Sequence, residues 1–144
     1  MKERLYKVKV KLERDMIFKY DLGEIKLREC IIDETNKNES DMLGPNAAHL
    51  LAMAVLGCLS SSYIFCFSKR DFTFKDLEAV AIVTVSRNEK GFARVKKIDV
   101  TINPKIDSPD MRKRAAQCQK MFEQYCTITA SVREGIDVNV KIDY

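Results

Sequence analysis

The first third of the chain alternates apolar and polar residues in short runs, as half-buried β-strands do. Residues 5–12 alternate lysines with tyrosine, valine and leucine, which predicts a first strand. Two further runs, over residues 16–20 and 25–32, predict a second and a third strand. The polar turns at residues 13–15 and 21–24 are short enough to join these strands as antiparallel hairpins.

A different pattern follows, because the 27 residues at positions 42–68 contain no Asp, Glu, Lys or Arg. Charged residues make up 32% of the chain, so such a run is unusual here. Pro45 and Asn46 mark its start, and the alanines and leucines that follow favour a helix. Apolar residues lie on every face of that helix, which predicts apolar surroundings on all sides.

Those surroundings are either lipid or protein. The run meets the length rule for a membrane-spanning helix. However, Gly57 and the serines at 60–62 lie at its middle, no second span follows, and residues 1–4 do not begin a signal peptide. We therefore expect a core helix in a cytoplasmic protein without a membrane span. A second subunit of a homodimer would cover the apolar surface that one subunit leaves free.

The second half of the chain predicts a hairpin, a helix and a last strand. Residues 77–86 are apolar on both faces, which predicts a strand covered on both sides, and a returning strand follows over 92–102. A second helix begins at Pro109 with Ser108 as its cap. Residues 136–142 alternate cleanly as a strand. The order β-β-β-α-β-β-α-β indicates an α+β fold with antiparallel sheets around a central apolar helix.

Length, charge and cysteine content limit the classes of function that fit this chain. A chain of 144 residues is long enough for one domain, 1–144, with its own core. The net charge of +4 is spread among acidic residues, and the basic cluster at 111–114 fits the solvated face of a helix better than a nucleic-acid site. Five cysteines without a Cys-x-x-Cys pair, and a single histidine, indicate a reducing compartment and predict neither a metal site nor a cofactor.

The cysteines are the candidate reactive groups. We expect Cys66 and Cys118 to be small core residues, because both lie among apolar residues of predicted helices. Cys30 lies late in a strand and has no partner in the sequence. Cys126 ends the second helix, where a thiol is partly exposed, whereas Cys58 lies within the apolar helix. The residues alone leave open whether Cys58 and Cys126 are inert or form a redox pair.

Three segments resemble motifs of the OsmC/Ohr family of thiol peroxidases, the osmotically inducible protein C-like and organic hydroperoxide resistance proteins. Residues 44–58 resemble the opening of that family's central helix, an alanine-rich run that ends in Gly-Cys. Residues 124–136 resemble its second cysteine motif, and residues 31–35 resemble the Asp-Glu-Pro that closes its third strand. The resemblance implies an intertwined α+β homodimer with two active sites at the subunit interface.

The resemblance also implies a mechanism. Cys58 would attack the O–O bond of an organic hydroperoxide as a thiolate, and Cys126 would then close a disulfide with it. A dithiol reductant, lipoyl- or thioredoxin-like, would reopen that disulfide. A thiolate in a dry site needs a nearby cation. In the Ohr branch an Arg-Asp pair in the first hairpin turn supplies it; Arg14, followed by Asp15, stands at this place, and Arg28 is a second candidate.

The chain departs from the family pattern at the start of the central helix. Ala47 replaces a proline, and Ala48 replaces the glutamate that holds the arginine in the Ohr branch. His49, the next residue, either substitutes for that glutamate or caps the helix. Thr127 replaces the proline after the second cysteine. These changes support an alternative function, a catalytically degenerate OsmC-like protein that binds a small apolar ligand.

Overall fold

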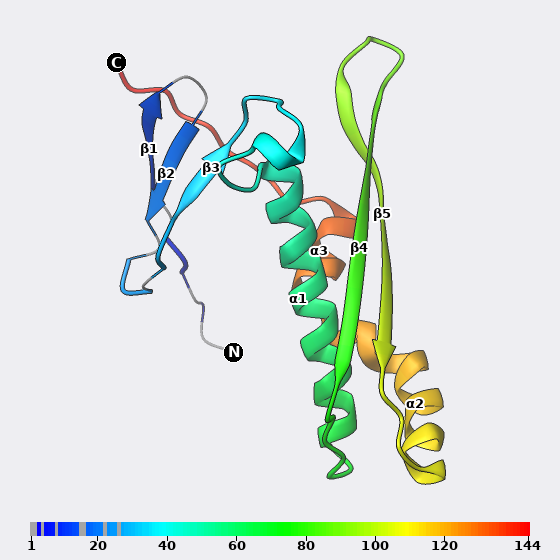
Figure 1. Ribbon diagram of the computed structural model, residues 1–144. Coiled ribbons are helices and arrows are strands. Elements are labelled where there is room, and N and C mark those ends of the chain that lie inside the picture. The colour runs from blue at the N-terminus through cyan, green and yellow to red at the C-terminus, as the bar shows by residue number, and fades with distance from the viewer. Residues whose placement is uncertain (1–2, 4, 8, 15–16, 22, 26) are drawn as a thin grey trace. The chain divides into compact units, whose positions relative to one another are not determined.

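The computed structural model consists of two compact units, Met1–Leu51 and Ala52–Tyr144. Its helices and antiparallel sheets confirm the predicted α+β class (Figure 1). The structure describes residues 3, 5–7, 9–14, 17–21, 23–25 and 27–144.

The N-terminal unit is built on an antiparallel sheet. Strands β1 (Lys9–Arg14), β2 (Ile17–Asp21) and β3 (Ile31–Asp33) are its members, in the order β1-β2-β3. The first strand begins and ends later than predicted, so that Arg14, expected in a turn, is its last residue. A register shift between Leu12 and Arg14 marks a bulge at this point. Asp15 and Met16, parts of the predicted turn and second strand, lie outside the described residues.

Strand β3 is shorter than the predicted strand over residues 25–32. Residues 27–30 belong to no strand, and the side chains of Arg28 and Glu29 are exposed. These two consecutive charged residues break the alternation that a half-buried strand needs, so the sheet pairs only with the apolar end of the run.

The buried carboxylate of Asp33 holds the loop that leads from β3 to the central helix. Its oxygens accept hydrogen bonds from the hydroxyl and the backbone N–H of Thr35, at 2.5 and 2.9 Å, and from the backbone N–H of Leu43, at 3.0 Å. These bonds, that of the Thr35 side chain first, lower the pKa of Asp33 to about 2. The loop includes one short 3₁₀ helix, η1 (Glu39–Asp41).

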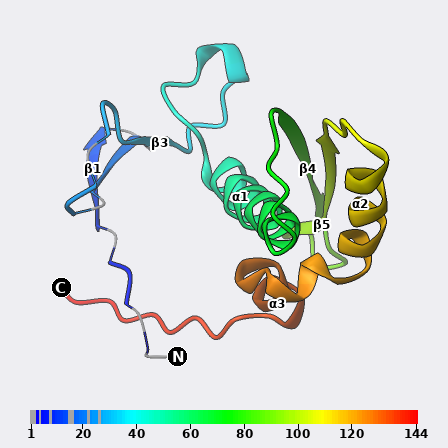
Figure 2. The same ribbon diagram turned by 90° about the horizontal axis from the view of Figure 1, so that it is seen from below.

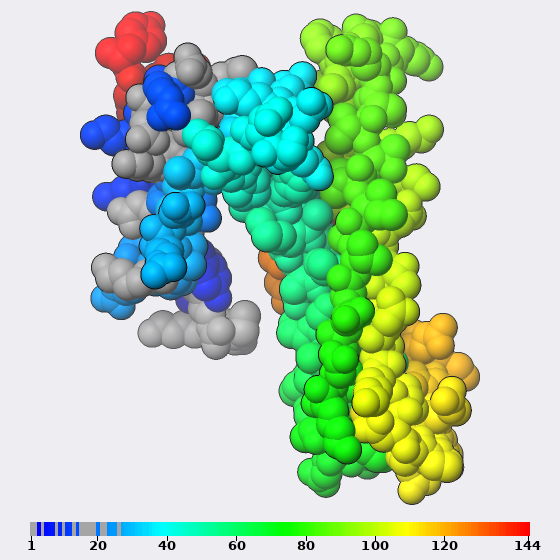
Figure 3. All heavy atoms as spheres, viewed as in Figure 1, coloured from blue at the N-terminus to red at the C-terminus, as the bar shows by residue number. Residues whose placement is uncertain are grey.

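The central helix α1 (Ala47–Ser68) has nearly the bounds that the apolar run predicts. The chain covers only one side of it, so the predicted apolar surroundings are present on that side alone. Met53, Ile64 and Phe65 on the other side keep 52%, 41% and 50% of their surface exposed. Figure 3 shows atoms of α1 at the surface beside the neighbouring hairpin. The buried side consists of Val55, Leu59, Ser62, Tyr63, Cys66 and Phe67.

A long antiparallel hairpin packs against α1. Strands β4 (Leu77–Arg87) and β5 (Ala93–Pro104) agree with the predicted strands within two residues at each end. Their inner face covers the core, but Val80 and Ile82 of β4 are 51% and 60% exposed. The prediction that β4 is covered on both faces is therefore wrong for one subunit, because no layer of this unit lies on the outer face.

Three helical segments follow the hairpin. Helix α2 (Pro109–Met121) begins as predicted, since the Ser108 hydroxyl oxygen accepts a hydrogen bond from the Met111 backbone N–H at 3.1 Å. A 3₁₀ turn, η2 (Phe122–Tyr125), then leads into the short helix α3 (Thr127–Glu134). Figure 2, which looks almost along α1, shows the hairpin on one side of that helix and α3 on another.

The predicted last strand does not form in the described part of the chain. Residues 135–144 form neither helix nor strand, and their apolar side chains point into solvent. Alternation describes a strand, but a strand forms only where a neighbouring edge offers hydrogen bonds. No described strand pairs with this segment. Its exposed apolar side chains are those of Ile136, Val138, Val140 and Ile142.

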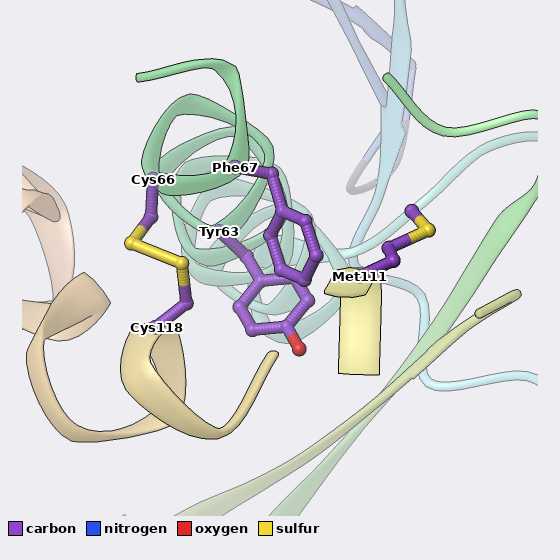
Figure 4. Packing of buried hydrophobic residues seen from close by; sticks show 5 residues of the cluster. All are labelled: Tyr63, Cys66, Phe67, Met111 and Cys118. Atoms are coloured by element: carbon purple, nitrogen blue, oxygen red, sulfur yellow. A yellow bond between two sulfur atoms is a disulfide. The ribbon is translucent and has the colours of Figure 1, made fainter. Parts of the chain in front are cut away.

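Cys66 and Cys118 form a disulfide that joins α1 to α2 (Figure 4). The expectation that both are inert core thiols is therefore wrong, although the expectation that both are buried is right. Apolar neighbours in the sequence do not distinguish a free thiol from a disulfide-bonded cysteine, because disulfide pairing depends on how two helices pack together. Around the bridge pack Tyr63, Phe67 and Met111.

Candidate paired-thiol site

The fold brings Cys58 and Cys126 together, although they lie 68 positions apart in the sequence. Cys58 is carried by α1, and Cys126 precedes the first residue of α3. Both thiols are free, and each affects the pKa of the other. They lie in a small apolar cluster whose buried members besides Cys126 are Val55 and Leu59.

Cys126 is the N-cap of α3 and is fully buried. The prediction that it is partly exposed at a helix end is therefore wrong. Its Sγ lies 2.9 Å from the hydroxyl oxygen of Thr129 and accepts the Thr129 backbone N–H at 3.4 Å. An N-cap position favours a negative charge, because the first N–H groups of a helix have no partner within the helix.

The two thiols affect each other's acidity in opposite directions. Burial raises the pKa of Cys58, and the hydrogen bond with Cys126 raises it further. Burial also disfavours a thiolate at Cys126, but hydrogen bonds from Cys58, Thr129 and Ser62 outweigh it and lower the pKa of Cys126. Cys126 is therefore the more acidic of the two thiols.

Ser62 and Thr129 belong to this site, and the sequence analysis did not identify them. The sequence spacing of each residue from one of the two cysteines could have identified it. Ser62 lies one helical turn after Cys58, on the same face of α1. Thr129 follows Cys126 by three positions, which is the spacing at which a capping residue meets a backbone N–H.

His49 caps α1, as one of the two predicted roles requires. Its backbone N–H donates to the Asn46 side chain at 3.0 Å, and its Nδ1 accepts the Asn46 backbone N–H at 3.2 Å. Its Nε2 lies 3.0 Å from the Glu39 carboxylate. Beside this reciprocal cap, the Glu34 carboxylate accepts the Ala47 backbone N–H at 2.5 Å. The polar ring of His49 is thus engaged within the N-terminal unit.

Arg14 and Arg28, the candidate cations, both belong to the N-terminal unit. Arg14 ends β1 and Arg28 precedes β3, and both side chains are exposed. Within the C-terminal unit, the groups that hydrogen-bond to the two thiols are hydroxyls, backbone amides and the thiols themselves. The roles of both arginines remain predictions. Among the described residues, no cluster of His, Cys, Asp and Glu could hold a metal ion.

An α+β chain that sets a free thiol of its central helix against a second free thiol at a helix N-terminus is a paired-thiol protein. Sequence comparison gives its family. The model of the OsmC-like protein family matches residues 36–141, and the chain belongs to this family. No curated protein matches the chain significantly.

Solved structures share the fold at low sequence identity. The organic hydroperoxide resistance protein OhrB of Bacillus subtilis is 18% identical, with a TM-score of 0.67 over 93% of this chain and 94% of that one. An OsmC-like protein of Mycoplasma pneumoniae is 12% identical, with a TM-score of 0.69 over 92% and 89%. An OsmC-like protein of unknown function from Vibrio cholerae is 11% identical, with a TM-score of 0.67 over 90% and 94%.

The family fold also explains the apolar character of α1. By length and hydropathy this helix is the one candidate membrane span among the described residues. In this structure it is the core helix on which the hairpin, α2 and α3 assemble, with Cys66 and Phe67 fully buried.

Proposed function

We propose that this protein is a thiol-dependent peroxidase that reduces organic hydroperoxides through Cys58 and Cys126, at the interface of a homodimer. The observation that carries the proposal is the pair itself. Two free thiols from distant segments pack in one cluster, and nothing in the packing of an apolar core requires both to be cysteine. The fold shared with OhrB supports the choice of an organic hydroperoxide as substrate.

The reaction needs two steps at the pair. The Cys58 thiolate attacks one oxygen of the O–O bond, which breaks to give a Cys58 sulfenic acid and, after protonation, an alcohol. The Cys126 sulfur then attacks the Cys58 sulfur and forms the disulfide, and the sulfenic oxygen leaves as water. A dithiol reductant returns both thiols and becomes a disulfide itself. We take that reductant to be a lipoyl or thioredoxin-like dithiol in the cytoplasm.

The main requirement of this mechanism is that Cys58 loses its proton. Cys58 is the less acidic of the two thiols, so it has to lose its proton before it attacks. Once Cys126 has lost its own proton, its thiolate can accept the proton of Cys58, which leaves a Cys58 thiolate. A cation close to Cys58 would favour that transfer, and Arg14 is the residue we propose for it.

A homodimer accounts for surfaces that one subunit leaves exposed. The outer side of α1, the outer face of β4 and the alternating residues after α3 are all apolar and exposed. Apolar surface of this extent on several elements is typical of an interface. The partner would thus lie beside the helix that carries Cys58, so that both chains contribute to each site.

The activity is tested with purified, reduced protein, cumene hydroperoxide and a dithiol. We expect the wild type to consume peroxide much faster than Cys58→Ser does. In Cys126→Ser the reaction should stop at the Cys58 sulfenic acid, because the thiol that forms the disulfide is missing. Cys30→Ser is the matched control, since Cys30 is the third free cysteine and lies in the other unit. Peroxide loss by the wild type that is no faster than that of Cys58→Ser would rule the proposal out.

One observation favours the second candidate function, a binding protein that has lost its chemistry. The pKa of Cys58 is raised, which is the opposite of what a peroxidase nucleophile needs. Such a protein would retain an apolar ligand at the same interface. Native mass spectrometry of freshly purified protein would show the ligand, and an empty protein with rapid peroxide turnover would exclude this candidate.

A further inference from the structure

We infer that the Cys66–Cys118 disulfide is a permanent brace that positions Cys126 opposite Cys58, and not a second reactive pair. The inference rests on the redox pair of the proposed function and adds two positioning residues to it. The bridge joins α1 to the last turn of α2, eight residues from Cys58 on one side and eight from Cys126 on the other.

The two cysteine pairs are the ends of one antiparallel contact. Along α1, Cys58, Ser62 and Cys66 follow one another at intervals of four residues, which keeps them on one face of the helix. Cys118, Phe122 and Cys126 repeat this interval in the facing segment. The members meet in reverse order. Cys66 is bonded to Cys118, whereas Cys126 packs with Cys58 in the other cluster, and both Cys58 and Ser62 lower its pKa.

Aromatic contacts fill the space between the two ends. The Phe122 ring packs edge-on against Tyr63, with 5.1 Å between centroids, and it touches the buried clusters around both cysteine pairs. The Tyr125 ring packs against Phe65 at 5.5 Å. The Lys69 ammonium donates to the Tyr125 hydroxyl at 3.0 Å. The segment between Cys118 and Cys126 therefore follows the surface of α1 closely.

The end with the bridge is held by covalent and polar contacts together. Cys66 and Cys118 are fully buried, and so is the neighbouring Phe67. The buried guanidinium of Arg114 donates twice to the backbone carbonyl of Cys66, from Nε at 3.2 Å and from Nη2 at 2.5 Å. That carbonyl lies in the last turn of α1, where helix carbonyls need partners from outside the helix. Covalent and polar contacts thus fix α2 to α1 at this end.

Helix geometry argues against exchange between the two pairs. Eight residues of α-helix rise about 12 Å, so the sulfur atoms of Cys58 and Cys66 are too far apart for a thiolate at one pair to attack a disulfide at the other. A reductant that reaches Cys58, which is only half-buried, does not reach the fully buried bridge. The bridge therefore stays closed while the reactive pair opens and closes.

The brace matters most while the reactive pair is open. Without the bridge, the chain that connects Cys58 to Cys126 is a loop of 68 positions. With the bridge, a shorter path connects them, which consists of the eight residues from Cys58 to Cys66 and the eight from Cys118 to Cys126. Loop-closure entropy grows with the logarithm of length, and this shortening raises the chance of encounter by up to about eightfold. Removal of the brace should slow closure of the reactive disulfide by up to this factor and leave the first attack on Cys58 unchanged.

Ellman's reagent separates the two steps without any peroxide. In the Cys30→Ser background, the first thionitrobenzoate released reports attack by the pair, and the second reports closure of the disulfide. The double variant Cys66→Ala, Cys118→Val removes the brace and retains an apolar core. We expect an unchanged first release and a second release slower by up to about eightfold. Because this assay needs no peroxidase turnover, failure of the proposed function would not affect its outcome.

Met111→Ala is the matched control, because it truncates a buried neighbour in the same cluster and leaves the bridge in place. If it slows closure as much as the double variant does, the bridge acts only through general packing and the inference is overturned. An unchanged second release in the folded double variant overturns it as well.

If the double variant does not fold, closure is followed in the Cys30→Ser chain after refolding with all thiols reduced. Alkylation and peptide mass spectrometry then distinguish the two pairs. Closure slower than in the bridged chain supports the inference, and equal rates contradict it.

Discussion

At the scale of single residues, the site depends on where one proton lies. Cys58 and Cys126 are chemically identical, yet their surroundings move their pKa values in opposite directions. The Cys126 sulfur accepts the backbone N–H of Thr129 and lies 2.9 Å from the Thr129 hydroxyl oxygen, whereas Cys58 lies in an apolar stretch of helix. The order of the pKa values thus follows from the burial of Cys58, from the interaction of the two thiols and from the contacts of Cys126 with Thr129. A cation from another part of the protein would have to reverse this order for direct attack by Cys58.

We expect this order to be measurable in single-cysteine variants. In Cys58→Ser, which keeps a hydroxyl donor to Cys126, the remaining thiol of the pair should titrate below the ordinary cysteine pKa. In Cys126→Ser the thiol of Cys58 should titrate above it. Thiolate absorbance in the ultraviolet against pH, in a Cys30→Ser background, gives both curves. The reverse order would show that a cation stabilises the Cys58 thiolate in the assembled protein.

Asp33 gives a second prediction at this scale. Its folded pKa is about 2, below its ordinary value of about 3.9. The ionised Asp33 carboxylate therefore stabilises the folded state fully above about pH 4, and this stabilisation is lost as the pH falls towards 2. We expect the free energy of unfolding of the wild type to fall more steeply over this range than that of Asp33→Asn. Parallel curves from urea denaturation at each pH would contradict this account.

Residue patterns predicted part of the site. Cys58 and Cys126 were recognisable from their flanking motifs, which follow local backbone structure. The Cys66–Cys118 bridge, by contrast, depends on the register between two helices, and no period along one segment reports that register. Arg114 was assigned to a solvated face, but its guanidinium is buried because it reaches a helix-end carbonyl of α1.

At the scale of elements, long regular patterns were predicted best. The apolar run gave α1, the β4–β5 hairpin was correct within two residues, and the start of α2 was correct because Ser108 and Pro109 act locally. The elements that depend on neighbours were predicted less well. β3 is cut short by two charged residues, and the segment after α3 has no described strand beside it.

Gly44 tests how tightly the loop before α1 packs on β3. A Cβ built at Gly44 would collide with the backbone carbonyl of Ile31, which has little freedom to move. We expect Gly44→Ala to destabilise the N-terminal unit by about 1–3 kcal/mol. Gly57→Ala is the contrast, since a Cβ on this helical glycine meets no atom within 4 Å, and we expect no loss. Similar denaturation midpoints for Gly44→Ala and the wild type would show that the loop can shift.

At the scale of the whole molecule, the two sides of α1 have different roles. Val55 lies on the side that is buried within the subunit, at 4% exposure, whereas Met53 lies on the outer side at 52%. The subunit core and the proposed dimer interface thus use neighbouring positions of one helix. The charge-free run in the sequence did not distinguish these roles, because both surfaces are apolar and the helical period separates them only once the neighbouring elements are known.

This separation predicts different results for two acidic substitutions. Val55→Asp would bury an unpaired carboxylate inside the subunit, at a cost of several kcal/mol, and should abolish folding. Met53→Glu places its charge on the exposed side, so the subunit should keep its helical circular dichroism but sediment as a monomer. Its peroxide turnover should also fall, because each proposed site needs both chains. If Met53→Glu remains a dimer with full activity, this side of α1 is not the interface, and the partner has to be sought at the outer face of β4 or along residues 135–144.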